Sequence, residues 1–268
     1  MCGSKKEGRL RRRARLASRR ARYGRVMRRV RLADGAKKSL MLATETLRVN
    51  ETFLSLQGEG SLIGTPAFFI RLDGCPLRCS WCDTPYALEG DAGRPMEVDA
   101  LLERVGAVRH VVITGGEPLA QDIAPLVAAL RDRHVTVETS GTIFADLPDV
   151  ALFSISPKVG TSGYSPKFAT LRKFCAASAH RMQLKFVIGE RRDYDEALEC
   201  VRTLAGALPA ATPVILQPES GRAGHGARYC AFLREMVGWT TADRRWDPFT
   251  PRVLPQLHYL LWDGEPGR

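Results

Sequence analysis

Hydrophobic positions beyond residue 46 follow two different periods along the chain. Short apolar runs typical of buried strands lie at 67–72, 110–114, 135–139, 151–156, 183–188 and 213–217, with a last one within 252–258. Apolar residues at the spacing of an amphipathic helix lie at 98–105, 123–130, 198–201 and 229–236. Strands separated by helices predict parallel βα units and therefore an α/β fold.

Polar and glycine-rich residues follow each of these predicted strands. They are Asp73-Gly74-Cys75, Thr114 to Pro118, Glu138 to Gly141, Ser156-Pro157-Lys158, Gln217 to Ser220 and Gln256-Leu257-His258. Parallel sheets and barrels build their active sites at the carboxyl ends of strands, so we expect one site there. About six βα units are too few for a complete eightfold barrel. The pattern predicts a partial, incomplete TIM-type barrel, with an open doubly wound sheet as the alternative.

Charge divides the chain into two parts. The 268 residues carry a formal net charge of +11, yet residues 1–40 hold 16 Lys and Arg against Glu7 and Asp34, a net of +14, so the rest carries −3. We expect a basic, disordered extension at 1–45 and a catalytic domain at 46–268. The extension is able to bind RNA or an anionic surface, but we favour a solvated arm or a leader translated from a start upstream of Met41. Nucleic acid is not an expected partner of the catalytic domain.

The apolar content and the cysteines indicate the cellular compartment. The chain is 44% hydrophobic, with no run of 18 apolar residues and no apolar stretch like that of a secretory signal. Seven cysteines in such a chain indicate free thiols and metal or redox ligands rather than a disulfide framework. We therefore expect a cytoplasmic protein that makes no membrane contact.

Three of the cysteines, Cys75, Cys79 and Cys82, fall within eight residues. A structural zinc site normally has four protein ligands, and nothing in the spacing recommends a fourth such as His110. Three thiolates can instead hold three irons of a four-iron cluster and leave the last iron open to an external ligand. The spacing favours the cluster over zinc or unbound thiols. Ordinary thiols are expected at Cys2, Cys175, Cys200 and Cys230.

The cysteine spacing C-x3-C-x2-C, with Trp81 before the third cysteine, resembles the radical S-adenosylmethionine (SAM) enzymes. The triplet Gly115 to Glu117 resembles that superfamily's second motif, which receives the amino group of the methionine moiety. The segments "LSLQGEGSLIGTPAFFIRLDGC" and "CSWCDTPYA", followed in order by "TGGEPL", "VETSG", "SPK", "LKFVI", "LQPE" and "QLH", closely resemble the 7-carboxy-7-deazaguanine synthase family over residues 46–262.

That resemblance implies a reaction and its cofactors. Members of the family convert 6-carboxy-5,6,7,8-tetrahydropterin to 7-carboxy-7-deazaguanine with loss of ammonia, on the route to queuosine and other 7-deazapurines. It implies one [4Fe-4S] cluster, SAM and Mg²⁺, with a 5′-deoxyadenosyl radical formed by one-electron cleavage of SAM. An electron donor such as flavodoxin and a homodimer are also implied.

The family's site residues carry over by motif. The cluster would be held by Cys75, Cys79 and Cys82, and magnesium by Thr84. SAM would be bound by Trp81, Cys82, Asp83, Gly116, Ser156, Pro157, Lys158, Gln217, Pro218, Glu219 and Ser220. The pterin would be contacted by Leu56, Gln57, Gly58, Glu59, Arg71, Thr114, Glu138 and His258. The family's lysine after this histidine is replaced by Tyr259, and a terminal-carboxylate contact seen in some members is not carried over, because the chain continues through "WDGEPGR".

Several of these residues have structural roles open to them as well. Arg71 can pair with Asp73, Thr84 can cap the cysteine loop, Gly115 and Gly116 can serve a tight turn, Ser156 can be a turn residue, Lys158 can be a surface lysine, and His258 can be packed. Two rival functions remain, a glycyl-radical activase and a zinc-containing RNA-binding protein. An activase needs neither Gln57 to Glu59 nor the Asp83-Thr84 pair, and a zinc protein would be colourless.

Overall fold

The structure, a computed structural model, describes residues 45–178, 180–263, 265 and 267. Residues 1–44 of the predicted basic extension and Cys2 lie outside these described residues. No helix among the described residues is both long enough and apolar enough to cross a membrane.

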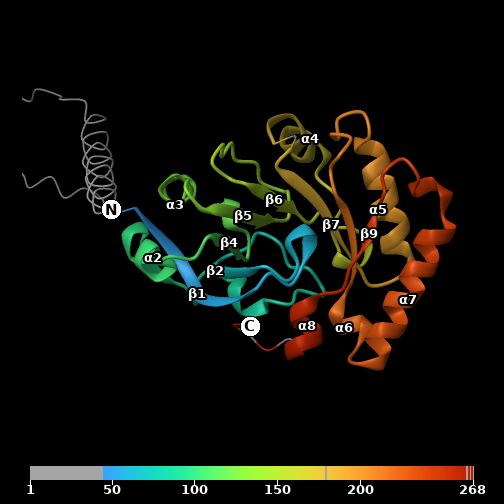
Figure 1. Ribbon diagram of the computed structural model, residues 1–268, viewed down its shortest axis with the longest axis horizontal. Coiled ribbons are helices and arrows are strands. Elements are labelled where there is room, and N and C mark those ends of the chain that lie inside the picture. The colour runs from blue at the N-terminus through green and yellow to red at the C-terminus, as the bar shows by residue number, and fades with distance from the viewer. Residues whose placement is uncertain (1–44, 179, 264, 266, 268) are drawn as a thin grey trace, which may run out of the picture. The chain divides into compact units, whose positions relative to one another are not determined.

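One nine-stranded sheet organises the described chain (Figure 1). Its order is β3-β1-β2-β4-β5-β6-β7-β8-β9, and all neighbours from β2 to β9 are parallel, whereas β1 pairs antiparallel with both β2 and β3. The strands are β1 Thr46–Leu56, β2 Pro66–Leu72, β3 Arg94–Glu97, β4 His110–Gly115, β5 His134–Thr139, β6 Leu152–Ile155, β7 Met182–Ile188, β8 Val214–Pro218 and β9 Arg252–Val253.

The strand order settles the choice between the two predicted architectures. From β2 to β9 the spatial order follows the chain order without reversal. A doubly wound sheet reverses its order at a switch point, so that alternative is wrong. The sheet ends at β3 and β9 rather than closing on itself. The predicted partial TIM-type barrel is confirmed.

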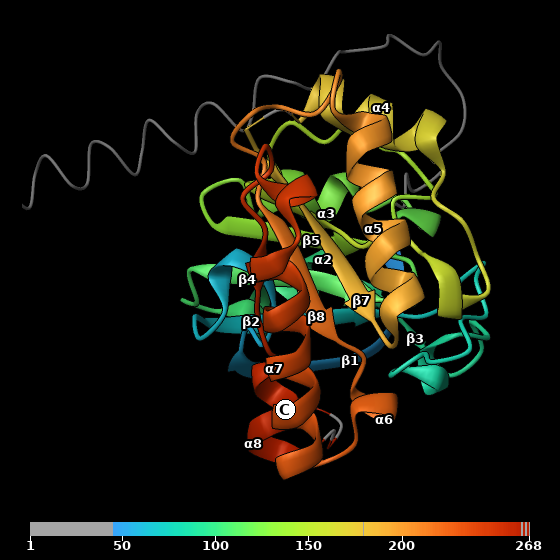
Figure 2. The ribbon, with the colours of Figure 1, turned by 90° about the vertical axis from the view of Figure 1, so that its right-hand side faces the viewer.

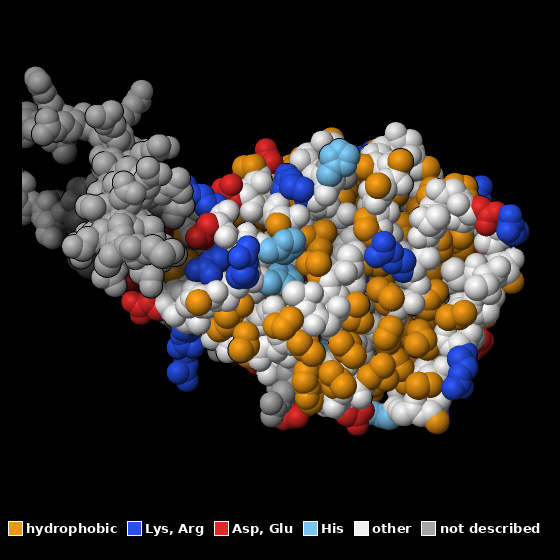
Figure 3. All heavy atoms as spheres, in the orientation of Figure 1, with side chains coloured by type: hydrophobic (Ala, Val, Ile, Leu, Met, Phe, Trp, Pro, Cys, Tyr) orange, Lys and Arg blue, Asp and Glu red, His pale blue; other side chains and the backbone are white. Residues whose placement is uncertain are grey.

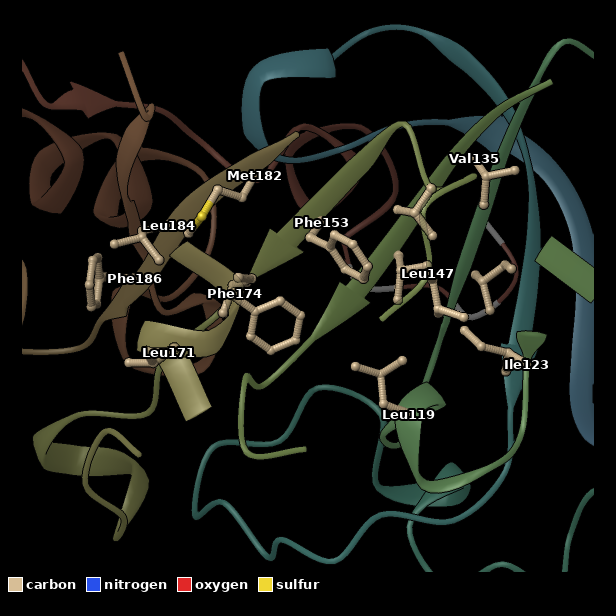
Figure 4. Close-up of a cluster of buried hydrophobic side chains, with 14 of the residues drawn as sticks. Leu119, Ile123, Val135, Leu147, Phe153, Leu171, Phe174, Met182, Leu184 and Phe186 are labelled. Carbon is tan, nitrogen blue, oxygen red and sulfur yellow. The ribbon is translucent and has the colours of Figure 1, made fainter. Parts of the chain in front are cut away.

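Helices cover the outer face of the sheet. They are α2 Val98–Val105, α3 Ala124–Ala129, α4 Phe168–Ala177, α5 Arg191–Leu204 and α7 Ala227–Ala242. The short helices α6 Ser220–Ala223 and α8 Leu257–Trp262 contribute residues to the cavity instead. Figure 2 shows α5 and α7 lying across the strands β7 and β8. The main core fills the space between these helices and the sheet. Within it the rings of Phe153 and Phe174 meet edge to face with centroids 5.3 Å apart (Figure 4).

Strand β7 shows how one strand serves both the core and the interior of the barrel. Leu184, Phe186 and Ile188 belong to the core cluster under the helices. The alternate residues Gln183, Lys185 and Val187 point to the opposite face, because side chains alternate along a strand. All seven residues of β7 are buried. A lysine and a glutamine are therefore enclosed by the barrel, which requires partners for them.

The predicted strands and helices are all present, but two strands, β1 and β3, and three α-helices, α4, α6 and α8, were not predicted. Strands β1 and β3 lack a continuous apolar run, because much of β1 is half-buried or exposed. Helix α4 was missed although its buried Leu171, Phe174 and Cys175 have helical spacing. The last predicted strand shrinks to two residues, and α8 begins directly after Gln256.

Candidate functional site

A cavity of about 390 Å³ lies at the carboxyl ends of the parallel strands. The size is at the lower end of the range for small-molecule sites. The residues expected from the sequence that line it are Leu56, Gln57, Gly58, Glu59, Arg71, Cys75, Cys79, Trp81, Cys82, Asp83, Thr84, Thr114, Gly116, Glu138, Ser156, Lys158, Glu219, Ser220 and His258. Pro157, Gln217 and Pro218 were expected to line the SAM pocket but do not line the cavity.

The three clustered cysteines lie in an irregular loop between β2 and β3 and face the cavity as free thiols. The loop begins at Gly74 and Cys75, whose amides donate to the carbonyls of Ala87 and Leu88 at 2.9 Å each. Burial raises the pKa of all three thiols, so ligation would have to displace their protons. Among the described residues, no three His, Cys, Asp or Glu side chains converge on a single-ion position. A four-iron cluster does not need such a point, because its thiolates bind separate irons.

The glycines after β4 bring that strand end against the cysteine loop. Gly115 has a φ of +141°, and a Cβ there would lie 2.1 Å from the Leu72 carbonyl oxygen. A Cβ on Gly116 would lie 2.3 Å from the carbonyl oxygen of Gly74. These glycines therefore do more than form a tight turn, because no other residue allows the two backbones to approach so closely.

Glu117, the last residue of the triplet, is completely buried. Its carboxylate accepts hydrogen bonds from the Thr139 hydroxyl (2.7 Å), from the amide and hydroxyl of Ser140, and from the Leu119 amide (3.2 Å). It joins the end of β4 to the end of β5 and does not line the cavity. Its carboxylate is thus occupied within the protein, whereas Gly115 and Gly116 line the cavity.

The segment after β6 lies beside the cysteine loop. Lys158 Nζ is 5.0 Å from the centre of the Trp81 ring and donates to Ser156 Oγ at 3.2 Å. A cation over an indole ring is attracted by the ring quadrupole. Lys158 is therefore not the solvated surface lysine that the sequence left open, and it places a positive charge near the thiols.

Two carboxylates lie on another part of the cavity wall. Gln57 Nε2 donates to Glu138 Oε1 at 3.0 Å, and Thr114 Oγ1 donates to Glu138 Oε2 at 2.9 Å. The second carboxylate, Glu59, accepts from the side-chain amides of Gln217 and Gln256 at 2.7 Å each. Gln217 thus reaches the site through Glu59.

Lys185 completes this group and was not among the expected site residues. Its ammonium contacts the Glu59 carboxylate, and the two side chains are only 9% and 11% exposed. Burial lowers the pKa of Lys185 to about 8, which still leaves it protonated at pH 7. A signal for it existed in the sequence, since Gln183 and Lys185 interrupt an apolar strand at a spacing of two and so share a face.

Arg71 is held by neighbours that the sequence did not indicate. Its Nε donates to Glu51 Oε1 at 2.7 Å, so the alternative pairing with Asp73 is wrong. Its guanidinium also lies 5.9 Å from the ring of Tyr86, whose hydroxyl donates to the same Glu51 oxygen at 3.0 Å. Burial acts to lower the pKa of Arg71, but Tyr86, Glu51 and Asp83 together raise it. The residue is a permanent cation at the cavity wall.

Thr84 is buried beside this arginine. Its hydroxyl donates to Asp83 Oδ1 at 3.1 Å and accepts from Arg71 at 3.4 Å. It makes no side-chain capping bond to the turn Pro85–Ala87, so the capping role is wrong. Thr84 and Asp83 instead present oxygen atoms of the kind that Mg²⁺ prefers.

His258 reaches the cavity from α8. A Cβ on Gly58 would lie 2.0 Å from His258 Nδ1, so Gly58 leaves room for the ring. Burial lowers the pKa of His258, and Lys185 and Arg71 add to this, while Asp83 and Glu138 act in the opposite direction. Tyr259, Glu265 and Gly267 line the same cavity, whereas the terminal carboxylate, whose contact was not carried over, belongs to Arg268 outside the described residues.

The chain is similar in sequence to a known superfamily and to several known enzymes. Residues 69–220 match the radical SAM superfamily. A 7-carboxy-7-deazaguanine synthase of Pyrobaculum aerophilum is 35% identical over 239 residues, covering 85% of this chain and 100% of the relative. A synthase of Halobacterium salinarum is 35% identical, covering 82% and 92%.

A solved structure agrees with the sequence comparison. The crystal structure of QueE from Escherichia coli is similar with a TM-score of 0.61 and 28% identity, covering 80% of this chain and 95% of that chain. The Pyrobaculum and Halobacterium relatives are covered over 100% and 92% of their own length, and the superfamily match includes all three clustered cysteines. The chain therefore belongs to the 7-carboxy-7-deazaguanine synthase family of radical SAM enzymes.

Proposed function

We propose that this chain converts 6-carboxy-5,6,7,8-tetrahydropterin to 7-carboxy-7-deazaguanine with release of ammonia, in queuosine or other 7-deazapurine synthesis. The observation that carries the proposal is that one cavity holds three thiols together with a largely buried arginine and two hydrogen-bonded carboxylates. The thiols suit a cluster, and the other groups suit a polar bicyclic substrate with a carboxylate. Residues 46–268 would form the catalytic domain, with 1–45 as an extension outside it.

Membership of the superfamily implies a four-iron cluster and SAM, and in our proposal Cys75, Cys79 and Cys82 hold the cluster. When bound, the cluster and SAM would supply the radical chemistry that removes a hydrogen atom from the substrate. Lys158, Ser156 and Glu219 would orient the carboxylate and polar groups of SAM, because all three line the cavity and Lys158 lies beside Trp81 of the cysteine loop. Substrate and SAM bound together would displace water from the reacting atoms.

The substrate would be recognised by groups already fixed in place. Arg71 donates from Nε to Glu51 and from Nη1 to Thr84, which leaves Nη2 and the second hydrogen of Nη1 to meet the substrate carboxylate. Glu138 is oriented by Gln57 and Thr114 and can accept hydrogen bonds from ring nitrogens. Because these side chains are held by packing and hydrogen bonds, little ordering is needed when the substrate binds.

Magnesium would bind through the hydroxyl of Thr84, with Asp83 beside it, and would orient substrate oxygens. Arg71 lies within 3.4 Å of the same hydroxyl, so the substrate carboxylate would have to offset the repulsion between two cations. We therefore propose that magnesium binds together with the substrate rather than before it.

We also propose a cytoplasmic homodimer that receives electrons from a donor such as flavodoxin. Apolar side chains gather on the face where α8 lies (Figure 3), and Leu260 and Leu261 are 44% and 52% exposed there. Exposed apolar patches of this kind often mark protein interfaces. Analytical ultracentrifugation of a Leu261→Glu variant would test the dimer, which should dissociate if this face forms it.

The deciding experiment is anaerobic reconstitution with iron and sulfide, followed by incubation with the carboxytetrahydropterin, SAM, Mg²⁺ and a reductant. We expect absorbance near 400 nm from the cluster, 5′-deoxyadenosine, ammonia and the deazaguanine product. A colourless zinc protein would overturn the proposal in favour of the RNA-binding rival. SAM cleavage with radical transfer to a glycyl-radical enzyme, and no pterin turnover, would favour the activase.

A further inference from the structure

A carboxylate on the outside of the barrel is completely buried without lining the cavity. Asp193, in the first turn of α5, has no exposed surface. Its oxygens accept from the amides of Gly189 (2.8 Å) and Glu190 (3.1 Å), and the Glu190 bond belongs to a helix capping box. A capping box explains one of its bonds. The Gly189 bond is also local, but two further bonds to Asp193 come from a different part of the chain.

Those bonds go to the 3-10 turn Gly160–Ser162, directly after the Ser156-Pro157-Lys158 segment. Asp193 accepts from the amide of Thr161 at 2.7 Å and from its hydroxyl at 2.8 Å. Glu196, one turn further along α5, accepts from the amide of Gly160 at 2.6 Å. A Cβ on Gly160 would lie 2.3 Å from Asp193 Oδ1, and its φ is +34°. Two carboxylates of α5 therefore fix this turn through hydrogen bonds, and Gly160 allows their close approach.

The same turn holds the cysteine loop from the other side. Ser80, between Cys79 and Cys82, donates from its amide to the carbonyl of Ser162 at 3.3 Å and from its hydroxyl to the carbonyl of Thr161 at 2.5 Å. The amide of Arg78 donates to the hydroxyl of Tyr164 at 2.8 Å. A continuous path of hydrogen bonds thus runs from α5 through residues 160–164 to the middle of the loop.

We infer that Asp193 is a positioning residue for the iron–sulfur cluster, acting through Thr161 on Ser80. The inference rests on the proposal that Cys75, Cys79 and Cys82 hold the cluster. Residues 73–84, which include these cysteines, form no helix or strand, so the shape of this part of the loop depends on what its backbone is bonded to. Holding Ser80 fixes the backbone between two of the three thiols, and a rigid ligand set loses iron more slowly than a mobile one.

The test compares the rate at which an anaerobic chelator removes iron from reconstituted protein. Ser80→Ala removes the hydroxyl bond at an exposed position, and Ser80→Thr keeps it. Asp193→Asn replaces one acceptor oxygen by a donor. Asp195→Asn is the matched control, because it removes the same charge from the same helix. The Asp195 carboxylate forms ion pairs with the exposed Arg191 and Arg245.

We expect iron to leave the Ser80→Ala variant roughly threefold to tenfold faster than the parent. This is the change in an equilibrium constant that the loss of one hydrogen bond typically causes. Asp193→Asn should act at least as strongly, and the double variant should fall short of the product of the two, since both act along one path. Ser80→Thr and Asp195→Asn should match the parent. Parent-like iron release by Ser80→Ala at an unchanged melting temperature would overturn the inference, even if Asp193→Asn does not fold.

A second measurement separates this inference from the proposed function. Hydrogen exchange on the metal-free protein reads the amides of Arg78 and Ser80 directly. Ser80→Ala should speed their exchange while leaving the amides of β7 unchanged, whether or not the protein turns over a pterin. Unchanged exchange at both amides would show that the turn does not hold the loop. Failure of the parent to assemble any cluster would instead overturn the proposed function.

Discussion

Replacing Lys185 by Met removes one member of a buried ion pair. Both side chains are about nine-tenths buried, and Glu59 would be left as an enclosed carboxylate. Breaking such a pair costs about 3–5 kcal/mol because the remaining charge has no counterion. Glu59 keeps two amide donors at 2.7 Å, from Gln217 and Gln256, so we place the loss near the lower end, about 3 kcal/mol. For a domain of this size that corresponds to a melting temperature lower by roughly 6–12 °C.

The assay is urea and thermal unfolding of the metal-free protein at pH 7, followed by circular dichroism. The double variant Lys185→Met with Glu59→Gln removes the stranded charge and should recover a large part of the loss. Lys173→Met on α4 is the control, because Lys173 is exposed and its replacement should change stability by less than about 0.5 kcal/mol. Parent-like stability of Lys185→Met, or a double variant as unstable as the sum of the singles, would refute the reasoning.

Further predictions concern the cluster, the substrate and pH. Cys79→Ala should abolish the cluster absorbance while Cys175→Ala retains it, and full iron content in the first would contradict the ligand assignment. Gly116→Ala forces a Cβ to 2.3 Å from a backbone oxygen and should destabilise by about 1–3 kcal/mol, measured by urea unfolding. Arg71→Lys should weaken pterin binding by roughly 1.5–3 kcal/mol without loss of cluster, measured by calorimetry. Burial and then His134 lower the pKa of His110 from 6.5 to about 4, so the unfolded chain binds the proton first and stability should fall by about 2–3 kcal/mol between pH 6.5 and 4. His110→Gln should flatten that slope.

Patterns among neighbouring residues were enough to predict most strands and helices and the loop that carries the three thiols. Apolar periodicity is a property of neighbouring residues, so it identified the strands and helices of the barrel before any packing was known. The spacing of Cys75, Cys79 and Cys82 is equally local, and all three face one cavity. Residues at strand ends came together for the same reason, because parallel strands present their carboxyl ends at one edge.

The tertiary structure decided which charges meet. Lys185 and Glu59 are 126 residues apart in the chain, and nothing in either segment indicates the other. Glu51 reaches Arg71 because β1 runs antiparallel beside β2. The sequence did not predict β1, because most of its residues are half-buried or exposed. Asp193 reads as an ordinary capping residue of α5 until the turn at 160–162 is packed against it. A buried polar group must find a partner, but only the order and register of the strands determine which one it finds.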